Sequence, residues 1–254
     1  MKENLKQLGA IILAAGKGKR MNSKKLNKVV LNLADKPMVL HTYDLLKSVR
    51  IDQIIVVVGF AKESVMKSLG RKVTYAEQKK RLGTAHAVSV ALKKIPGNIK
   101  HVLVLNGDDS AFYTKTTLKK LIAWHFKSGS DFTLLTIEKD DPTGLGRIVR
   151  DRNGKVISII EEKDATDKQR KIKEINPACY LFKVDFLKKY LGKVEKSKVT
   201  GEYYLTSLIN LGIISDAKIE THRMGKYIWR GVNTDEELRE AESLFNNHKS
   251  KKNK

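Results

Sequence analysis

The sequence predicts an α/β fold, with a mostly parallel central sheet covered by helices on both faces and a smaller α+β lobe after it. Through about residue 130, short apolar segments alternate with segments of helical periodicity, which is the pattern of a parallel sheet with helical crossovers. From about residue 131 the expected strands are shorter and are separated by Gly and Asp-Pro turns. We therefore expect one domain at 1–245, divided into about 1–130 and about 131–245, and a polar tail at 246–254.

The first part of the chain supplies the alternating elements. Residues 8–14 form a continuous apolar run before Gly16 and Gly18, as expected for a strand that is buried on both faces and leads into a loop. Residues 37–49 repeat apolar side chains at helical spacing and begin with a proline, which is favoured in a first helical turn. The other predicted strands are 53–59, 72–75 and 101–105, and the other predicted helices are 61–69, 82–92 and 116–126.

The second part of the chain contains more strand than the first. Its predicted strands are 132–137, 148–150, 155–160 and 218–223, and its predicted helices are 184–190, 203–213 and a last one from residue 235. Thr234 and Glu237 form a capping box for that last helix. The nearly uniformly polar residues 246–254 are expected to fray.

The composition limits the classes of protein to consider. With 41% hydrophobic residues the chain can bury a core, so disorder throughout is excluded despite a net charge of +22. The excess of positive charge favours anionic partners, whether nucleic acid, lipid headgroups or phosphorylated small molecules. The single Cys179 forms no internal disulfide, and the longest apolar run, 54–58, is too short to span a membrane. We expect a cytoplasmic protein without membrane contact.

The loop after the first predicted strand is suited to phosphate binding. Residues 13–21 read Leu-Ala-Ala-Gly-Lys-Gly-Lys-Arg-Met, and backbone N–H groups of a glycine turn can approach phosphate oxygens beside several cations. Met21 in place of a third glycine disfavours a dinucleotide-binding motif, and no Gly-Lys-Ser/Thr follows to make a Walker A motif. An ordinary strand-to-helix turn is the alternative interpretation.

A second polar loop, Asn106-Gly107-Asp108-Asp109, follows the predicted strand at 101–105. A carboxylate there can hold a divalent metal ion against a bound phosphate, whereas the alternative is an Asx turn that ends the strand. Because both loops follow strands of the same parallel sheet, we expect them to lie at one edge of that sheet.

Further motifs follow in order, and together the set resembles the sugar-1-phosphate nucleotidyltransferases. The motifs are Lys-Val at 28–29, Leu-Gly-Thr-Ala-His-Ala at 82–87, Gly-Asp at 107–108, Gly-Leu-Gly-Arg-Ile at 144–148, Glu-Ile-Asn at 174–176, Gly-Glu-Tyr-Tyr-Leu-Thr at 201–206 and Gly-Val-Asn at 231–233. The resemblance covers residues 8–245 and is strongest to the uridylyltransferase (pyrophosphorylase) domain of the bacterial bifunctional GlmU proteins. It implies a Rossmann-like fold of the GT-A type.

The resemblance also implies a role for each motif. The residues it places on the nucleotide and its phosphates are Leu13, Ala14, Ala15, Gly16, Arg20, Lys28, Gln78, Gly83, Thr84, Asn106 and Gly107. The residues it places on the sugar are Gly146, Glu161, Asn176, Tyr203 and Thr206. Asp108 and Asn233 are the implied Mg²⁺ ligands. Base choice is assigned to Gln78, Gly83 and Thr84, since an amide and backbone groups can match the donor and acceptor edge of uracil and leave cytosine unpaired.

The implied substrates are UTP and N-acetylglucosamine 1-phosphate, and the implied products are UDP-N-acetylglucosamine and pyrophosphate. An oxygen of the sugar phosphate attacks the α-phosphorus of UTP in line. No general base is required, because a phosphate is already a nucleophile at neutral pH. The catalytic requirement is relief of charge repulsion, which the resemblance assigns to Arg20, Lys28 and Mg²⁺ with its ligand Asp108, and alignment, which it assigns to the sugar pocket.

Several positions depart from the family pattern. Asn27 stands where a proline usually precedes the lysine at position 28. Pro177-Ala178 follows Asn176 in place of Thr-Gly, and Arg230 stands where an acidic residue often precedes the Gly-Val-Asn motif. A related enzyme with another sugar or nucleotide is therefore an alternative. A nucleic-acid-binding protein on a retired enzyme scaffold is a second, less favoured one.

Two other expectations complete the interpretation. His86, inside an Ala-rich helix, is interpreted as a structural histidine. No hexapeptide repeat is present, so we do not expect the β-helical acetyltransferase domain of the bifunctional proteins. Because the parent family trimerises largely through that domain, we expect a monomer.

Overall fold

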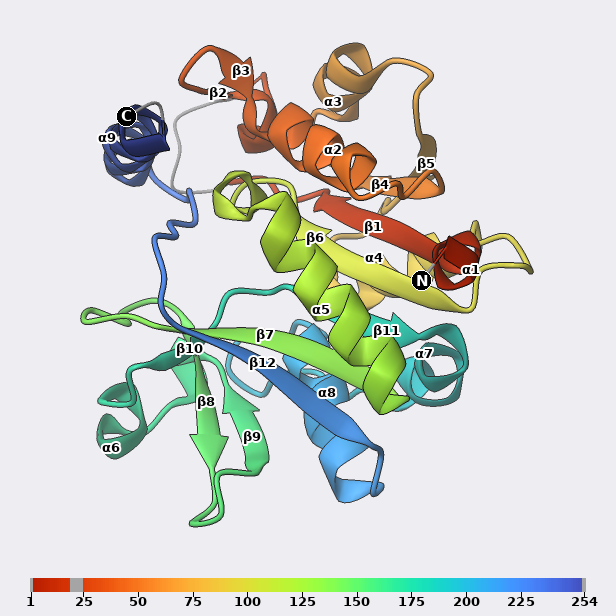
Figure 1. Cartoon of the computed structure of the whole chain (residues 1–254), viewed down its shortest axis with the longest axis vertical. Helices are drawn as coiled ribbons and strands as arrows, with labels where there is room; N and C mark the ends of the chain where they lie inside the picture. The colour runs from red at the N-terminus through yellow and green to blue at the C-terminus, as the bar shows by residue number, and fades with distance from the viewer. Residues whose placement is uncertain (1, 19–24, 253–254) are drawn as a thin grey trace.

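The computed structural model describes residues 2–18 and 25–252, and within them the chain forms one mixed sheet of ten strands with helices on both faces (Figure 1). The parallel part runs in the order β5 (Thr74–Glu77), β4 (Ile54–Val58), β1 (Leu8–Ala14) and β6 (His101–Asn106). β1, β4 and β6 are apolar runs that are almost entirely buried, as expected for strands covered on both faces. The predicted α/β fold is confirmed.

The second half of the chain extends this sheet and does not form a separate one. The connecting strand is β11 (Tyr180–Lys183), which lies between β6 and β7 (Phe132–Glu138) and is antiparallel to both. The remaining strands are β10 (Glu174–Asn176), β8 (Gly146–Arg150) and β9 (Val156–Ile160), all antiparallel to their neighbours, and β12 (Ile219–Lys226), which is parallel to β7. The sequence pattern missed β10 and β11, because three or four residues are too few to display an alternation.

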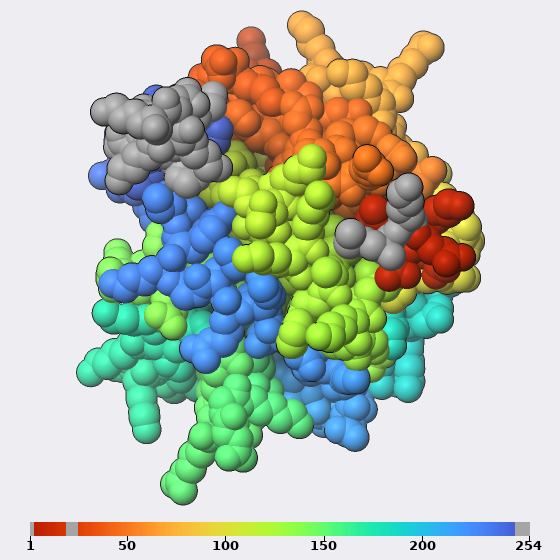
Figure 2. All heavy atoms as spheres, in the orientation of Figure 1, coloured from red at the N-terminus to blue at the C-terminus, as the bar shows by residue number. Residues whose placement is uncertain are grey.

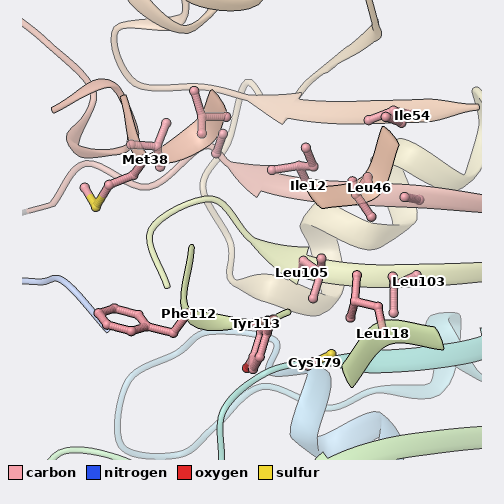
Figure 3. Close-up of a cluster of buried hydrophobic side chains, with 14 of the residues drawn as sticks. Ile12, Met38, Leu46, Ile54, Leu103, Leu105, Phe112, Tyr113, Leu118 and Cys179 are labelled. Carbon is pink, nitrogen blue, oxygen red and sulfur yellow. The ribbon is translucent and has the colours of Figure 1, made fainter. Parts of the chain in front are cut away.

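Helices cover the sheet on both faces. Those on one face are α2 (Met38–Ser48), α3 (Lys62–Leu69) and α5 (Lys115–Ser128), and those on the other are α4 (Thr84–Leu92), α7 (Val184–Tyr190) and α8 (Leu205–Ile214). Successive side chains of β1 point to opposite faces of the sheet. Ile12 belongs to the hydrophobic cluster on the face of α2, α3 and α5, here the first cluster, and Ile11 belongs to the second cluster, on the face of α4, α7 and α8. In the first cluster, side chains of β1, β4 and β6 meet Leu46 of α2 and Leu118 of α5 (Figure 3). On the same face of the molecule, β12 lies beside α5 (Figure 2).

Short elements connect this framework. The further helices are α1 (Lys2–Lys6), α6 (Asp167–Arg170) and α9 (Asp235–Lys252), the one-turn 3₁₀ segments are η1 (Lys28–Val30), η2 (Ser110–Phe112), η3 (Glu162–Asp164) and η4 (Leu191–Lys193), and a small hairpin joins β2 (Asn32–Leu33) to β3 (Lys36–Pro37). No helix in 2–18 or 25–252 is both long and apolar enough to cross a membrane.

Most element boundaries differ from the expected ones by a few residues, and three of these differences have a clear physical reason. Pro37 is the N-cap of α2, which begins one residue later. α8 begins at Leu205 and not at residue 203, because the backbone of Tyr203 is bonded to another segment. The backbone of α9 remains helical to Lys252, where fraying was expected from residue 246, since polar residues without Gly or Pro do not by themselves end a helix.

Candidate active site

Two predicted loops meet at the carboxyl edge of the parallel strands. Leu13 at the end of β1 pairs in register with Asn106 at the end of β6. The next residue, Gly107, donates its N–H to the carbonyl oxygen of Leu13 at 3.0 Å. The expectation that the glycine loop and the Asn-Gly-Asp-Asp loop share one edge of the sheet is therefore confirmed.

Asn27 holds the glycine loop from within the protein. Its side chain is completely buried, and its amide nitrogen lies 2.9 Å from the carbonyl oxygen of Ala14, 3.2 Å from that of Gly16 and 2.8 Å from that of Phe60. Its amide oxygen accepts from the N–H of Val29 at 3.2 Å. The residue that departs from the family pattern thus ties the ends of β1 and β4 to the turn that carries Lys28.

We expect Asn27→Ala to destabilise the protein and to weaken nucleotide binding. The substitution leaves three carbonyl groups without this donor, which corresponds to a loss of about 2 kcal/mol in the free energy of unfolding. Urea unfolding monitored by circular dichroism measures the loss, and the KM for the nucleotide measures the effect on the loop. Asn98→Ala is the matched control, since Asn98 is exposed and makes a single long bond of 3.5 Å. Equal stability of the two variants would contradict this role for Asn27.

Lys28 lies between the two predicted metal ligands. Its ammonium group forms an ion pair with Asp108, donates to Oδ1 of Asn233 at 2.9 Å and to the carbonyl oxygen of Val232 at 3.1 Å. The side chains of Lys28 and Asp108 are 15% and 11% exposed, so the pair is largely screened from water. Residues separated by 80 and 205 positions in the sequence therefore meet at one point.

The oxygens around this ammonium group fit a hard cation. A carboxylate and an amide oxygen are the ligand types that Mg²⁺ prefers, and Mg²⁺ commonly completes its shell with water and substrate phosphates. Within the described ranges no group of three or more His, Cys, Asp and Glu side chains could hold a metal ion by itself. The residues present thus fit a metal that is shared with a phosphate and not one that is enclosed by the protein.

The capping of α9 positions Asn233. The N–H of Glu237 donates to Oγ1 of Thr234 at 3.1 Å, as predicted. The Glu237 carboxylate returns to the N–H of Asn233 at 2.6 Å, one residue earlier than in a regular capping box. Asn233 can therefore line the site although it flanks the capped end of α9. The hydrogen bond from its N–H to Glu237 holds it in place at the start of that helix.

A cavity of about 230 Å³ opens beside this centre, between the end of β6 and the β8, β9, β10 and α8 region. The predicted residues that line it are Leu13, Thr84, Asn106, Asp108, Gly146, Glu161, Asn176, Thr206 and Asn233. The predicted residues that lie outside its lining are Ala14, Ala15, Gly16, Lys28, Gln78, Gly83, Gly107 and Tyr203. Arg20 lies outside the described residues.

Glu161 places a half-buried carboxylate in the cavity wall. It accepts a hydrogen bond from Oγ1 of Thr206 at 2.8 Å. Burial raises the pKa of Glu161, the Asp164 charge raises it further, and the Thr206 bond opposes the rise. A carboxylate with so few partners has acceptor capacity left for the hydroxyl or amide groups of a ligand.

Asn176 is fixed from both ends of its side chain. Its Nδ2 donates to the hydroxyl oxygen of Tyr180 at 2.5 Å, and its Oδ1 accepts from the N–H of Ala178 at 3.1 Å. Ala178 adopts a φ of +54° at the position where the family pattern has glycine. The bonds of Asn176 thus support a turn that Pro177 and Ala178 would otherwise disfavour.

Arg147 anchors the loop at the start of β8. It is almost completely buried, and it donates to Glu162 at 2.6 Å and to the carbonyl oxygen of Arg170 at 3.2 Å. The same Glu162 oxygen accepts from the N–H of Gly144 at 3.2 Å. This ion pair therefore links the Gly144–Gly146 turn, at the start of β8, to the segment that follows Glu161.

Gly83 forms the junction between the two halves of the site. Its φ is +106°, and a Cβ atom there would lie 2.5 Å from the carbonyl oxygen of Tyr203 and 2.7 Å from its nitrogen. Around it, the N–H of Tyr203 donates to the carbonyl oxygen of Leu82 at 2.8 Å, and the N–H of Ala85 donates to that of Tyr203 at 2.9 Å. Only glycine permits this approach.

A model of the Nucleotidyl transferase family matches residues 9–248. The chain belongs to the nucleotidyl transferase family. Among curated proteins, the bifunctional protein GlmU of Thermoanaerobacter pseudethanolicus is 42% identical over 240 residues, which are 94% of this chain and 51% of that protein. The bifunctional protein GlmU of Caldicellulosiruptor saccharolyticus is 46% identical over 203 residues, which are 79% of this chain and 43% of that protein. The chain spans about half the length of the curated relatives it matches.

A solved structure supports the fold assignment. A protein from Bacillus anthracis named as a glucose-1-phosphate thymidylyltransferase, in complex with a sucrose, matches with a TM-score of 0.79 at 24% identity. The match covers 94% of this chain and 95% of that chain. The whole described sheet, including the antiparallel part, is therefore a nucleotidyltransferase fold.

The cavity is also lined by residues that the sequence interpretation left unassigned. They are Asp109, Gly144, Leu145, Pro177, Ala178, Tyr180, Tyr204, Leu205, Trp229 and Gly231. Half of them, Asp109, Leu145, Pro177, Tyr204 and Leu205, directly adjoin an assigned residue, so proximity to the motifs was the available signal for these. Tyr204 lines the cavity in place of its neighbour Tyr203, whose backbone is engaged with Leu82 and Ala85. Which of two adjacent tyrosines faces a cavity depends on how the chain enters α8, and composition carries no information about it.

Proposed function

We propose that the protein transfers a uridylyl group from UTP to N-acetylglucosamine 1-phosphate, forming UDP-N-acetylglucosamine and pyrophosphate. One observation carries the proposal: the Asp108 and Asn233 oxygens that surround the Lys28 ammonium group line the same cavity as Glu161 and Thr206. In this proposal the phosphates bind beside Asp108 and Asn233, and the sugar binds beside Glu161 and Thr206. The similarity to bifunctional GlmU proteins over 94% of the chain supports the choice of substrates.

The protein side of the reaction is positioning and charge neutralisation. Lys28 and Arg20 bind the triphosphate and reduce the repulsion between the two phosphate substrates. Glu161, Asn176 and Thr206 hold the sugar so that its phosphate oxygen faces the α-phosphorus from the side opposite the pyrophosphate. Because the attacking oxygen already carries charge at neutral pH, no residue is required to remove a proton.

Asp108 and Asn233 would hold Mg²⁺. When bound, Mg²⁺ supplies additional neutralisation of the phosphate oxygens. Lys28 would then exchange its bonds with Asp108 and Asn233 for bonds to phosphate, which its flexible side chain permits.

A pyrophosphate-release assay tests the proposal. The purified chain is incubated in Mg²⁺ buffer with each of UTP, CTP, ATP and dTTP against N-acetylglucosamine 1-phosphate, glucose 1-phosphate and glucosamine 1-phosphate. We expect the highest kcat/KM for UTP with N-acetylglucosamine 1-phosphate. No turnover with that pair would refute the proposal, and turnover with another pair would identify the related enzyme that Pro177 and Ala178 leave open.

We expect Glu161→Gln to separate stability from sugar binding. Burial raises the pKa of Glu161 in the folded protein, so the charged form opposes folding as the pH rises from about 4 toward neutral. The glutamine variant should therefore be more stable than the wild type at pH 7.5, by on the order of 1 kcal/mol, and this advantage should vanish near pH 4. At the same time the KM for the sugar 1-phosphate should rise about 10-fold, since a charge-assisted hydrogen bond is lost.

Denaturant unfolding between pH 4 and pH 8 measures the first effect and steady-state kinetics the second. Glu63→Gln is the control, because Glu63 is exposed on α3 and away from the cavity. A stability difference that does not change with pH would show that the charge of Glu161 is not the cause.

A further inference from the structure

The side-chain amide of Gln78 is held in one orientation. Gln78 is 4% exposed, and its backbone N–H donates to the carbonyl oxygen of Val58 at 2.8 Å, which anchors the residue at the end of β4. Its Nε2 lies 3.0 Å from the carbonyl oxygen of Gly83. A carbonyl oxygen accepts only, so the nitrogen and not the oxygen of the amide faces Gly83.

His86 takes the second hydrogen of the same amide nitrogen. Its Nδ1 lies 2.9 Å from Nε2 of Gln78, so Nδ1 is the unprotonated, accepting nitrogen of the ring. Burial and the charge of Lys93 lower the pKa of His86, which favours the neutral ring that this contact requires. His86 follows Gly83 on the first turn of α4, and the helix therefore brings both acceptors to one amide group.

The two bonds leave Oε1 as the free atom of the amide. Within residues 2–18 and 25–252, Oε1 accepts no hydrogen bond from the protein. An amide oxygen fixed in this way accepts from N3–H of uracil or thymine. It opposes the N3 lone pair of cytosine, which is itself an acceptor.

We propose that His86 is a positioning residue that keeps Oε1 of Gln78 directed to the nucleobase and thereby sets the preference for uracil over cytosine. This inference rests on the proposed uridylyltransferase function. Without His86, one amide hydrogen has no acceptor and the amide can rotate to present Nε2, the arrangement that cytosine accepts. The histidine interpreted from the sequence as structural then acts on specificity through Gln78 without touching the substrate.

Steady-state kinetics of the full chain with UTP and with CTP test the inference. We expect His86→Ala to raise the KM for UTP about 10-fold with little change in kcat, and to lower the ratio of kcat/KM for UTP to that for CTP by at least about 5-fold. His86→Asn should restore most of the ratio, because Oδ1 of asparagine can take the place of Nδ1. His86→Gln should not restore the ratio, because the longer glutamine side chain carries its oxygen to the position of the ring Nε2 of His86 and not to that of Nδ1.

His222→Ala is the matched control, since His222 is a partly buried histidine on β12 with no place in the site. It should leave the ratio unchanged. Circular dichroism and the melting temperature report whether each variant is folded. If His86→Ala does not fold, the comparison of His86→Asn with His86→Gln still tests the inference. An unchanged UTP-to-CTP ratio in a folded His86→Ala or His86→Gln variant would overturn the inference while the proposed function stands. Absence of UTP turnover in the wild type would overturn both.

Discussion

Asp108→Asn is expected to lower kcat about 10³-fold while leaving the fold intact. The carboxylate of Asp108 carries the only negative charge that contacts Lys28 among the described residues, and it lines the cavity where the two phosphates must meet. Asparagine keeps the shape and one acceptor oxygen but removes the charge that would hold Mg²⁺. Loss of one electrostatic contact at a reacting phosphate typically costs about 10² to 10³ in rate.

The measurement is pyrophosphate release at saturating substrates, accompanied by a titration of Mg²⁺. We expect the variant to need a higher Mg²⁺ concentration for half-maximal rate. Asp44→Asn is the matched control, because Asp44 also pairs with a lysine, Lys36, but does so at the surface, where such pairs contribute little. A near-normal kcat and Mg²⁺ requirement in Asp108→Asn would remove Asp108 from the catalytic centre.

Gly83→Ala is expected to have the largest effect on stability. A methyl group at this position would lie 2.5 Å and 2.7 Å from backbone atoms of Tyr203, which cannot move independently because two hydrogen bonds hold that residue. The φ of +106° adds strain for any residue with a Cβ atom. Together these terms correspond to a loss of about 3 to 5 kcal/mol in the free energy of unfolding.

Urea unfolding measures this loss as a shift of the midpoint at constant slope. Gly97→Ala is the control, since a Cβ atom there meets no atom within 4 Å, and we expect a change within about 1 kcal/mol. If Gly83→Ala were as stable as the control, the junction between residues 82–85 and Tyr203 would have to be looser than its geometry indicates. Any Gly83→Ala protein that does fold should also bind UTP poorly, because the Gly83 carbonyl helps to orient Gln78.

The parallel half of the fold was predictable because each of its central strands carries its own signal. β1, β4 and β6 are apolar runs that end in glycine or polar loops, and helical periodicity separates them. In such a sheet the carboxyl ends of adjacent strands must meet at one edge, so the proximity of Leu13 and Asn106 followed from topology. The antiparallel half was less predictable from the sequence, since the pairing of β11 with both β6 and β7 depends on strands that are distant in the sequence.

The sequence alone determined which residues are available for the chemistry: a glycine loop, an Asp108 carboxylate, a lysine beside the loop, and the order of the family motifs. These are local patterns, because local propensity and motif spacing depend only on residues that are close together in the sequence. The tertiary structure decided which of them meet. It placed Lys28 between Asp108 and Asn233, used Asn27 to hold the loop, turned Tyr204 and not Tyr203 to the cavity, and joined Gln78 to His86. Each of those contacts requires segments that are remote in the chain or side chains on a particular helix face, and packing of the two halves around one sheet selects them.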